Sequence, residues 1–150
     1  RQEERTVLSH TGNGYAIAPA ICYESIYGDF MTGFMRNGAN IIGIITNDGW
    51  WGNTSGHKQH LLYARLRAIE NRRWIARSAN TGISAFIDPY GRILQQQPWD
   101  KAVAIKEVVS LRTEMSFFSR NGDLISKIMV AGVLVLILMS LKKRRKKPAL

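Results

Sequence analysis

The sequence predicts an α/β fold that ends in one transmembrane helix, and three observations support this prediction. Apolar runs alternate with helix-compatible runs through residues 1–116, in the order strand, helix, strand, helix and then several strands. That order is typical of a layered α/β sandwich. A long apolar run follows at residues 124–141, and a block of lysines and arginines comes directly after it, at 142–147.

The first half of the chain predicts two strands around one helix. Residues 15–22 are apolar and follow a turn signal, and Pro19 marks this strand as an edge or bulged strand because proline cannot donate to a ladder. Residues 24–37 suit a helix that ends at an Asn-Gly pair. Residues 39–46 are rich in isoleucine, which is typical of a strand covered on both faces.

The second half predicts another helix and further strands. Thr54 or Ser55 can cap a helix that runs to about Arg73, and the spacing of Leu62, Leu66 and Ile69 predicts one apolar stripe on it. Strands are expected at 74–80 and 83–87, a β-turn at 88–91, and further strands at 92–97 and 102–109. The sheet is expected to need upstream strands to be complete.

The C-terminal run predicts a membrane anchor. A helix needs roughly 20 apolar residues, and at least about 17, to cross a bilayer, and residues 124–141 meet this limit if Lys127 reaches the interface. A buried core helix is the alternative, but the run has no polar face and a cationic block follows it. We therefore divide the chain into a domain at 1–116, a transmembrane helix at 124–141 and a basic tail at 142–150.

The charge distribution indicates orientation and excludes a class of partner. The formal net charge is +10, and the block at 142–147 holds six of the cationic residues. Because this block follows the apolar run and does not lie on the fold, it favours a membrane over nucleic acid. The positive-inside rule places the tail in the cytoplasm and the domain on the outer, periplasmic side. The chain begins without Met or a signal peptide, so we expect it to be the C-terminal piece of a longer, multi-pass membrane protein.

Cys22 is the candidate nucleophile. It is the only cysteine, which excludes an internal disulfide framework, and it lies where a predicted strand turns into a predicted helix. Helix N-terminal N–H groups favour a thiolate, the reactive form of cysteine. The backbone N–H of Tyr23 can serve as an oxyanion donor, and Glu24 either favours its helix N-terminus or acts as an accessory polar group. The alternative is that Cys22 is a small, buried and inert side chain.

The loop at 47–53 is the candidate substrate-binding region, with Asn47, Trp50 and Trp51. Ligands gather beyond the carboxyl ends of strands in open α/β sheets, although the two tryptophans can equally cover the edge of the core. His10, His57 and His60 are candidate bases by residue type alone, and the base is expected upstream. His57 and His60 lack further metal ligands nearby, so no metal site is predicted. Asp48, Ser55 and His57 lie too close in sequence to be expected to form a triad.

Several motifs resemble those of the carbon–nitrogen hydrolase (nitrilase-like) family. They are AICYE at 20–24, NDGWWG at 47–52, QH at 59–60, RLRAIE at 65–70 and RSANTGI at 77–83. With a membrane helix and a basic tail after the domain, the chain is similar to the membrane-bound apolipoprotein N-acyltransferases within that family. The resemblance implies a four-layer αββα sandwich, a Glu-Lys-Cys triad in which Cys22 is the nucleophile, and no cofactor. The triad Glu and Lys have no counterpart here and are expected upstream.

The resemblance also implies a reaction, in the bacterial inner membrane, with two lipid-anchored partners. Cys22 takes an acyl chain from a phospholipid as a thioester, and the N-terminal diacylglyceryl-cysteine of an apolipoprotein receives it as an amide. This chain alone is then expected to be inactive. Two other functions remain open from the sequence: a membrane-tethered amidase or nitrilase that hydrolyses C–N bonds, and a tethered binding domain with no catalysis.

Overall fold

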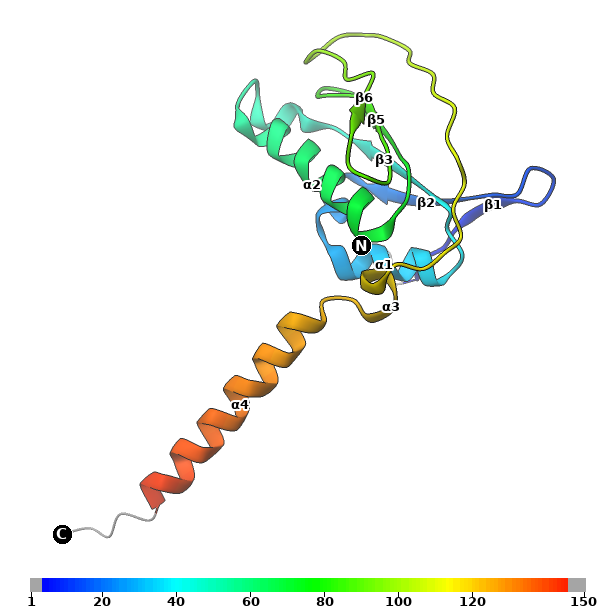
Figure 1. The fold of residues 1–150 in the computed structure, drawn as a ribbon. Helices are drawn as coiled ribbons and strands as arrows, with labels where there is room; N and C mark the ends of the chain where they lie inside the picture. Colours follow the sequence, from blue (N-terminus) through cyan, green and yellow to red (C-terminus); the bar gives the residue numbers. More distant parts are fainter. Residues whose placement is uncertain (1–3, 146–150) are drawn as a thin grey trace.

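The computed structural model describes residues 4–145 and contains a mixed β-sheet, helices on it, and a long helix that projects from the domain (Figure 1). The sheet order is β1-β2-β3-β4-β5-β6. Its central pairs, β2 with β3 and β3 with β4, are parallel, and the outer pairs are antiparallel. The strands are β1 (Leu8–His10), β2 (Tyr15–Ile21), β3 (Ile41–Thr46), β4 (Ile75–Ala79), β5 (Ala85–Ile87) and β6 (Ile93–Leu94).

Helices follow the parallel strands, as a βαβ arrangement requires. The two longer helices of the domain are α1 (Gly28–Arg36) and α2 (Ser55–Asn71), and short 3₁₀ turns η1 (Cys22–Ile26) and η2 (Asp48–Trp51) precede them. Thr54 caps α2 through its side chain, as predicted. Near the C-terminus are α3 (Phe117–Asn121) and α4 (Leu124–Arg145).

The core lies between one face of the sheet and the helices α1 and α2. Alternate residues of the strands point into it, among them Ala18, Ala20, Ile42 and Ile44, and they pack with apolar side chains of the two helices. The opposite face carries Ile17, Ile41 and Phe86 half-buried and Ile21 and Ile45 exposed. One sheet with one layer of helices is half of the predicted four layers, and the apolar open face is the surface that a second sheet would cover.

Most predicted strands are confirmed, with differences at their ends. β2 stops one residue early, because Cys22 already belongs to η1, and the helix predicted at 24–37 is divided between η1 and α1. The short strand β1 was not predicted. Pro19 pairs with β3 but lies beyond the residues of β2 that pair with β1, so it does occupy a local edge. The strand expected at 102–109 is wrong: these residues form no ladder with any strand that the structure describes.

The apolar stripe predicted on α2 lies on the outward face of the helix. Leu62, Leu66 and Ile69 are each at least 40% exposed. The face of α2 that packs on the sheet instead contains His57, His60, Leu61, Ala64, Arg67, Ala68 and Asn71. His60, Arg67 and Asn71 form hydrogen bonds on this buried face, which periodicity alone cannot reveal.

Two neighbouring leucines of α2 offer a matched test of this orientation. Leu61 is 4% exposed and Leu62 is 52% exposed. We expect Leu61→Ala to lower the free energy of unfolding by about 2–5 kcal/mol, because it leaves a cavity in the core. Leu62→Ala is expected to change it by no more than about 0.5 kcal/mol. Urea denaturation of both variants measures the difference, and equal losses would contradict the orientation described here.

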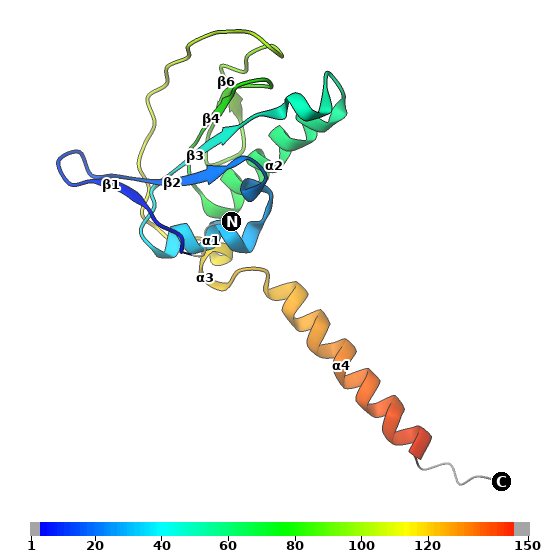
Figure 2. The ribbon, with the colours of Figure 1, turned by 180° about the vertical axis from the view of Figure 1, so that it is seen from behind.

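The long helix α4 projects away from the domain (Figure 2). Hydrogen bonds hold the segment that connects it to the domain. Asp29 of α1 accepts a hydrogen bond from the backbone of Asp123 at 2.9 Å, and Arg36 donates to the carbonyls of Ser119 and Arg120. Within α4, Leu124–Lys142 is long and apolar enough to cross a membrane, and none of it is buried in the structure. The helix continues to Arg145, so the predicted tail begins inside it, and residues 146–150 of that tail lie outside the described residues.

Candidate active site

Cys22 lies at a sharp elbow between β2 and η1. Its φ of 50° is in the left-handed region, which is rare for residues other than glycine and costs conformational energy. The elbow is held on its N-terminal side by Glu24, whose carboxylate accepts a hydrogen bond from the backbone of Ile21 at 3.0 Å. The side chain is half-buried, and it lines an open cavity of about 400 Å³ together with Ile21, Tyr23, Glu24, Tyr27 and Phe30.

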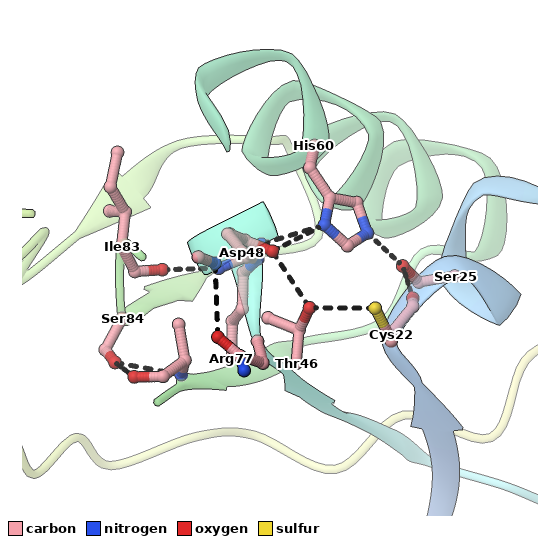
Figure 3. Close-up of polar contacts among 11 residues, drawn as sticks. Cys22, Ser25, Thr46, Asp48, His60, Arg77, Ile83 and Ser84 are labelled. Atoms are coloured by element: carbon pink, nitrogen blue, oxygen red, sulfur yellow. Dashed lines mark hydrogen bonds and ion pairs between the residues drawn. The ribbon is translucent and has the colours of Figure 1, made fainter. Parts of the chain in front are cut away.

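A closed ring of polar contacts begins and ends at Cys22 (Figure 3). The hydroxyl of Thr46 lies 3.4 Å from the sulfur and 2.9 Å from Oδ1 of Asp48. The same Asp48 oxygen lies 2.9 Å from Nδ1 of His60. Nε2 of His60 lies 3.1 Å from the hydroxyl of Ser25, which donates to the carbonyl of Cys22 at 2.8 Å. The ring therefore contacts both the side chain and the backbone of Cys22.

Asp48 is the charged centre of this ring. It is fully buried, and Nη2 of Arg77 donates to its Oδ2 at 2.7 Å. Burial opposes ionisation of this carboxyl group, but hydrogen bonds from His60, Arg77 and Thr46 and the charge of Arg77 outweigh it and lower its pKa to about 2. The carboxylate can only accept, so Nδ1 of His60 carries the hydrogen in their contact. Nη1 of Arg77 donates to the backbone carbonyl of Ile83 at 2.6 Å, so the Arg77–Asp48 ion pair is also held by the segment between β4 and β5.

Aromatic rings stand beside the elbow. The ring of Tyr23 lies 5.5 Å from the rings of both Trp51 and His60, and Trp51 contacts His60 edge-on at 5.6 Å. Trp50 is 85% exposed on η2. Asn47 caps η2 by accepting a hydrogen bond from the backbone of Gly49 at 3.1 Å. The structure thus brings Tyr23 and Glu24 to the cavity at Cys22 and packs Trp51 against Tyr23 and His60. Trp50 faces solvent, and the amide oxygen of Asn47 caps η2.

Sequence reasoning missed two members of the ring, Thr46 and Ser25, and also the contact between Asp48 and His60. Asp48 pairs with His60, and His57 instead lies against Trp99 with ring centres 4.2 Å apart. The position of Thr46 could have been predicted from the alternation of side chains along a strand, because Thr46 lies on the same inward face of β3 as Ile42 and Ile44. Within residues 4–145, the structure places no group of three or more His, Cys, Asp or Glu side chains that could hold a metal ion.

The sequence profile of the carbon–nitrogen hydrolase family matches residues 2–115. The chain belongs to the carbon–nitrogen hydrolase family. Its match to the family covers the whole sheet and the polar ring, and it stops just before α3. The elbow and the polar ring thus lie within a carbon–nitrogen hydrolase domain, and the apolar helix α4 lies after that domain.

Curated relatives of this carbon–nitrogen hydrolase chain are named apolipoprotein N-acyltransferase. The protein from Chlorobaculum tepidum is 40% identical over 139 residues, which is 89% of this chain and 26% of that protein. The protein from Pseudomonas putida is 44% identical over 100 residues, or 66% of this chain and 20% of that protein. The chain therefore spans about a fifth to a quarter of the length of these relatives.

Solved structures confirm the fold class. An amidase from Nesterenkonia sp. matches with a TM-score of 0.53 and 20% identity, over 67% of this chain and 39% of that chain. A point mutant of that amidase, with acrylamide added at its active-site cysteine, matches with a TM-score of 0.52. The superposition covers well under half of the amidase, which agrees with one sheet and one helical layer of the larger sandwich.

Proposed function

We propose that this chain is the C-terminal part of an apolipoprotein N-acyltransferase in which Cys22 is the nucleophile. The sulfur attacks the acyl ester of a phospholipid, a thioester forms and a lysophospholipid leaves. The α-amine of a diacylglyceryl-cysteine at an apolipoprotein N-terminus then attacks the thioester, an amide forms and the thiol is restored. The observation that carries this proposal is a single cysteine at a strained elbow, beside an open cavity, in a chain whose relatives bear this name.

The local geometry supports the other roles in this proposal. The N–H of Tyr23 lies in the first turn of η1, where N–H groups have no acceptor within the helix, so it is a suitable donor to the oxyanion. Glu24 is accessory, because it holds the elbow through Ile21. Trp51 packs against Tyr23, and we assign substrate binding to Trp51, Trp50 and Asn47 of the η2 loop.

The remaining triad residues and the membrane anchor are assigned to segments outside this domain. By resemblance to the family, a Glu and a Lys upstream of this chain complete the triad, and the Glu is the base that takes the thiol proton. The helix α4 crosses the bacterial inner membrane, with the domain on the outer face and the basic tail in the cytoplasm. This placement keeps Cys22 near the bilayer, where both lipid-anchored substrates reside.

Trapping of the thioester tests this function. The protein that carries these residues, with its upstream part, is incubated in detergent with a phospholipid whose acyl chain is labelled, and the peptide containing Cys22 is analysed by mass spectrometry. We expect a hydroxylamine-sensitive acyl adduct on Cys22, and none on the 150-residue chain alone. A diacylglyceryl peptide should discharge the adduct as an amide. Release of free fatty acid in its presence would instead indicate a hydrolase, and a lack of any adduct would contradict the proposal.

A further inference from the structure

We infer that Thr46 is a positioning residue for the Cys22 sulfur, through a hydroxyl whose single hydrogen serves either the sulfur or Asp48. This inference rests on the proposed role of Cys22 as nucleophile. The contacts that carry it are the 3.4 Å distance from Oγ1 of Thr46 to the sulfur and the 2.9 Å distance from the same oxygen to Oδ1 of Asp48 (Figure 3).

A threonine hydroxyl has one hydrogen to donate and lone pairs to accept with. Asp48 and a thiolate are both acceptors only, so they compete for that hydrogen. A neutral thiol or a thioester needs it less than a thiolate does, because hydrogen bonds to charged acceptors are about twice as strong as neutral ones. The direction of the Thr46 hydroxyl is therefore expected to follow the charge on the sulfur.

Asp48 can release the Thr46 hydrogen at small cost. Its Oδ1 retains the contact with Nδ1 of His60 at 2.9 Å, and its Oδ2 retains the bond from Arg77 at 2.7 Å. The carboxylate thus stays paired when the hydroxyl turns toward sulfur. The charge of Arg77 also compensates that of Asp48, which would otherwise oppose a second negative charge close by.

The hydroxyl is held in place for this task. Thr46 is the last residue of β3 and is 5% exposed. Its carbonyl accepts a hydrogen bond from the backbone of Asn80 at 2.9 Å, which pins the strand end against the loop after β4. A β-branched side chain has few χ1 rotamers, so Oγ1 stays between the two acceptors and only its hydrogen needs to turn. No atom is transferred; the hydrogen changes its acceptor by rotation about the Cβ–Oγ1 bond.

The alkylation rate of Cys22 tests this inference, because Cys22 is the only cysteine of the chain. In Thr46→Val the hydroxyl is replaced by a methyl group of similar size. Loss of a hydrogen bond to a charged sulfur lowers the thiolate population roughly 10- to 100-fold. The more basic thiolate is intrinsically more nucleophilic, which recovers about half of the loss on a logarithmic scale. We therefore expect iodoacetamide to react about 3- to 10-fold more slowly at neutral pH.

Conservative and control variants separate positioning from a merely structural role. Thr46→Ser keeps the hydroxyl and should react within about twofold of the parent chain. Thr32→Val removes another buried threonine hydroxyl, one that donates to a backbone carbonyl in α1, and should leave the rate unchanged. If Thr46→Val does not fold, as judged by circular dichroism, Thr46→Ala takes its place. Parent-like reactivity of the folded Val or Ala variant, or a Ser variant as slow as Val, would overturn the inference.

A second readout keeps this inference distinct from the proposed function. In the acyl-transfer assay, Thr46→Val should lower kcat for thioester formation by a similar factor and leave KM for the phospholipid unchanged, because Thr46 faces the sulfur and not the lipid. If Cys22→Ala transfers acyl chains normally, the proposed function fails, whereas the alkylation result still reports on Thr46. If Cys22 forms a thioester but the alkylation rate of Cys22 is the same in Thr46→Val as in the parent chain, only the inference about Thr46 fails.

Discussion

Replacing Cys22 with alanine is expected to abolish acyl transfer, with a fall in turnover on the order of 10⁴- to 10⁶-fold, the range seen when a covalent nucleophile is removed. The alanine side chain cannot form a thioester, so the reaction loses its intermediate and must proceed by direct attack of the amine on the ester. The measurement is transfer of a labelled acyl chain to a diacylglyceryl peptide, with the upstream part of the protein present.

The fold should survive this change, which makes the loss interpretable. Cys22 is half-buried, and its carbonyl, which accepts from Ser25, is retained in the alanine variant. Cys22→Ser is the closer control, because it keeps a nucleophilic atom at the same elbow but a far weaker one at neutral pH. Both variants should unfold within a few degrees of the parent. Transfer by Cys22→Ala at the parental rate would contradict the role of Cys22.

Replacing Asp48 with asparagine is expected to cost about 3–5 kcal/mol of unfolding free energy, the usual result of breaking a buried ion pair on one side. The change leaves Arg77 buried without its counter-charge, and His60 loses its charged partner. Because Asp48 also contacts Thr46, the Cys22 elbow should loosen at the same time. Chemical denaturation monitored by the four tryptophans measures the loss.

The pH dependence of stability provides an independent check on the same residue. The pKa of Asp48 is about 2 in the folded chain, below its ordinary value of 3.8, so the folded state prefers the ionised form. Its contribution to stability is fully present above about pH 4 and is lost as the pH falls toward about 2. Asp48→Asn should lack this component of acid unfolding. Asp100→Asn, at an exposed position, is the matched control and should stay within about 0.5 kcal/mol of the parent.

The parallel strands explain why residues that are far apart in the sequence lie together around Cys22. Thr46 ends β3 and Asp48 follows it, and Arg77 lies on β4, the strand parallel to β3. The carboxyl ends of parallel strands meet at one edge of the sheet, and Cys22 lies at the same edge after β2. His60 reaches the ring from α2, which packs over that edge. A substitution in any of these elements is thus expected to alter the position of the Cys22 sulfur.

Strands and helices were predicted best where the local signal was strong. The isoleucine-rich run of β3, the cap of α2 at Thr54 and the apolar run of α4 all appear as expected. The strand predicted at 102–109 was wrong. An apolar pattern shows that a segment can form a strand, but it does not show that a neighbouring strand is available to pair with it. The stripe on α2 was predicted without showing which face of the helix is buried, because polar side chains such as Arg67 occupy the buried face.

Local sequence was enough to specify the order of the elements, the place of a lone cysteine after a buried strand and the apolar helix near the C-terminus, because these features depend on residues close together along the backbone. The folded arrangement was needed to show that Thr46, Asp48, His60 and Ser25 form a ring around Cys22, and which face of α2 is buried. Hydrogen bonds and ion pairs between distant residues depend on how strands register and helices pack, and no short pattern along the chain specifies these.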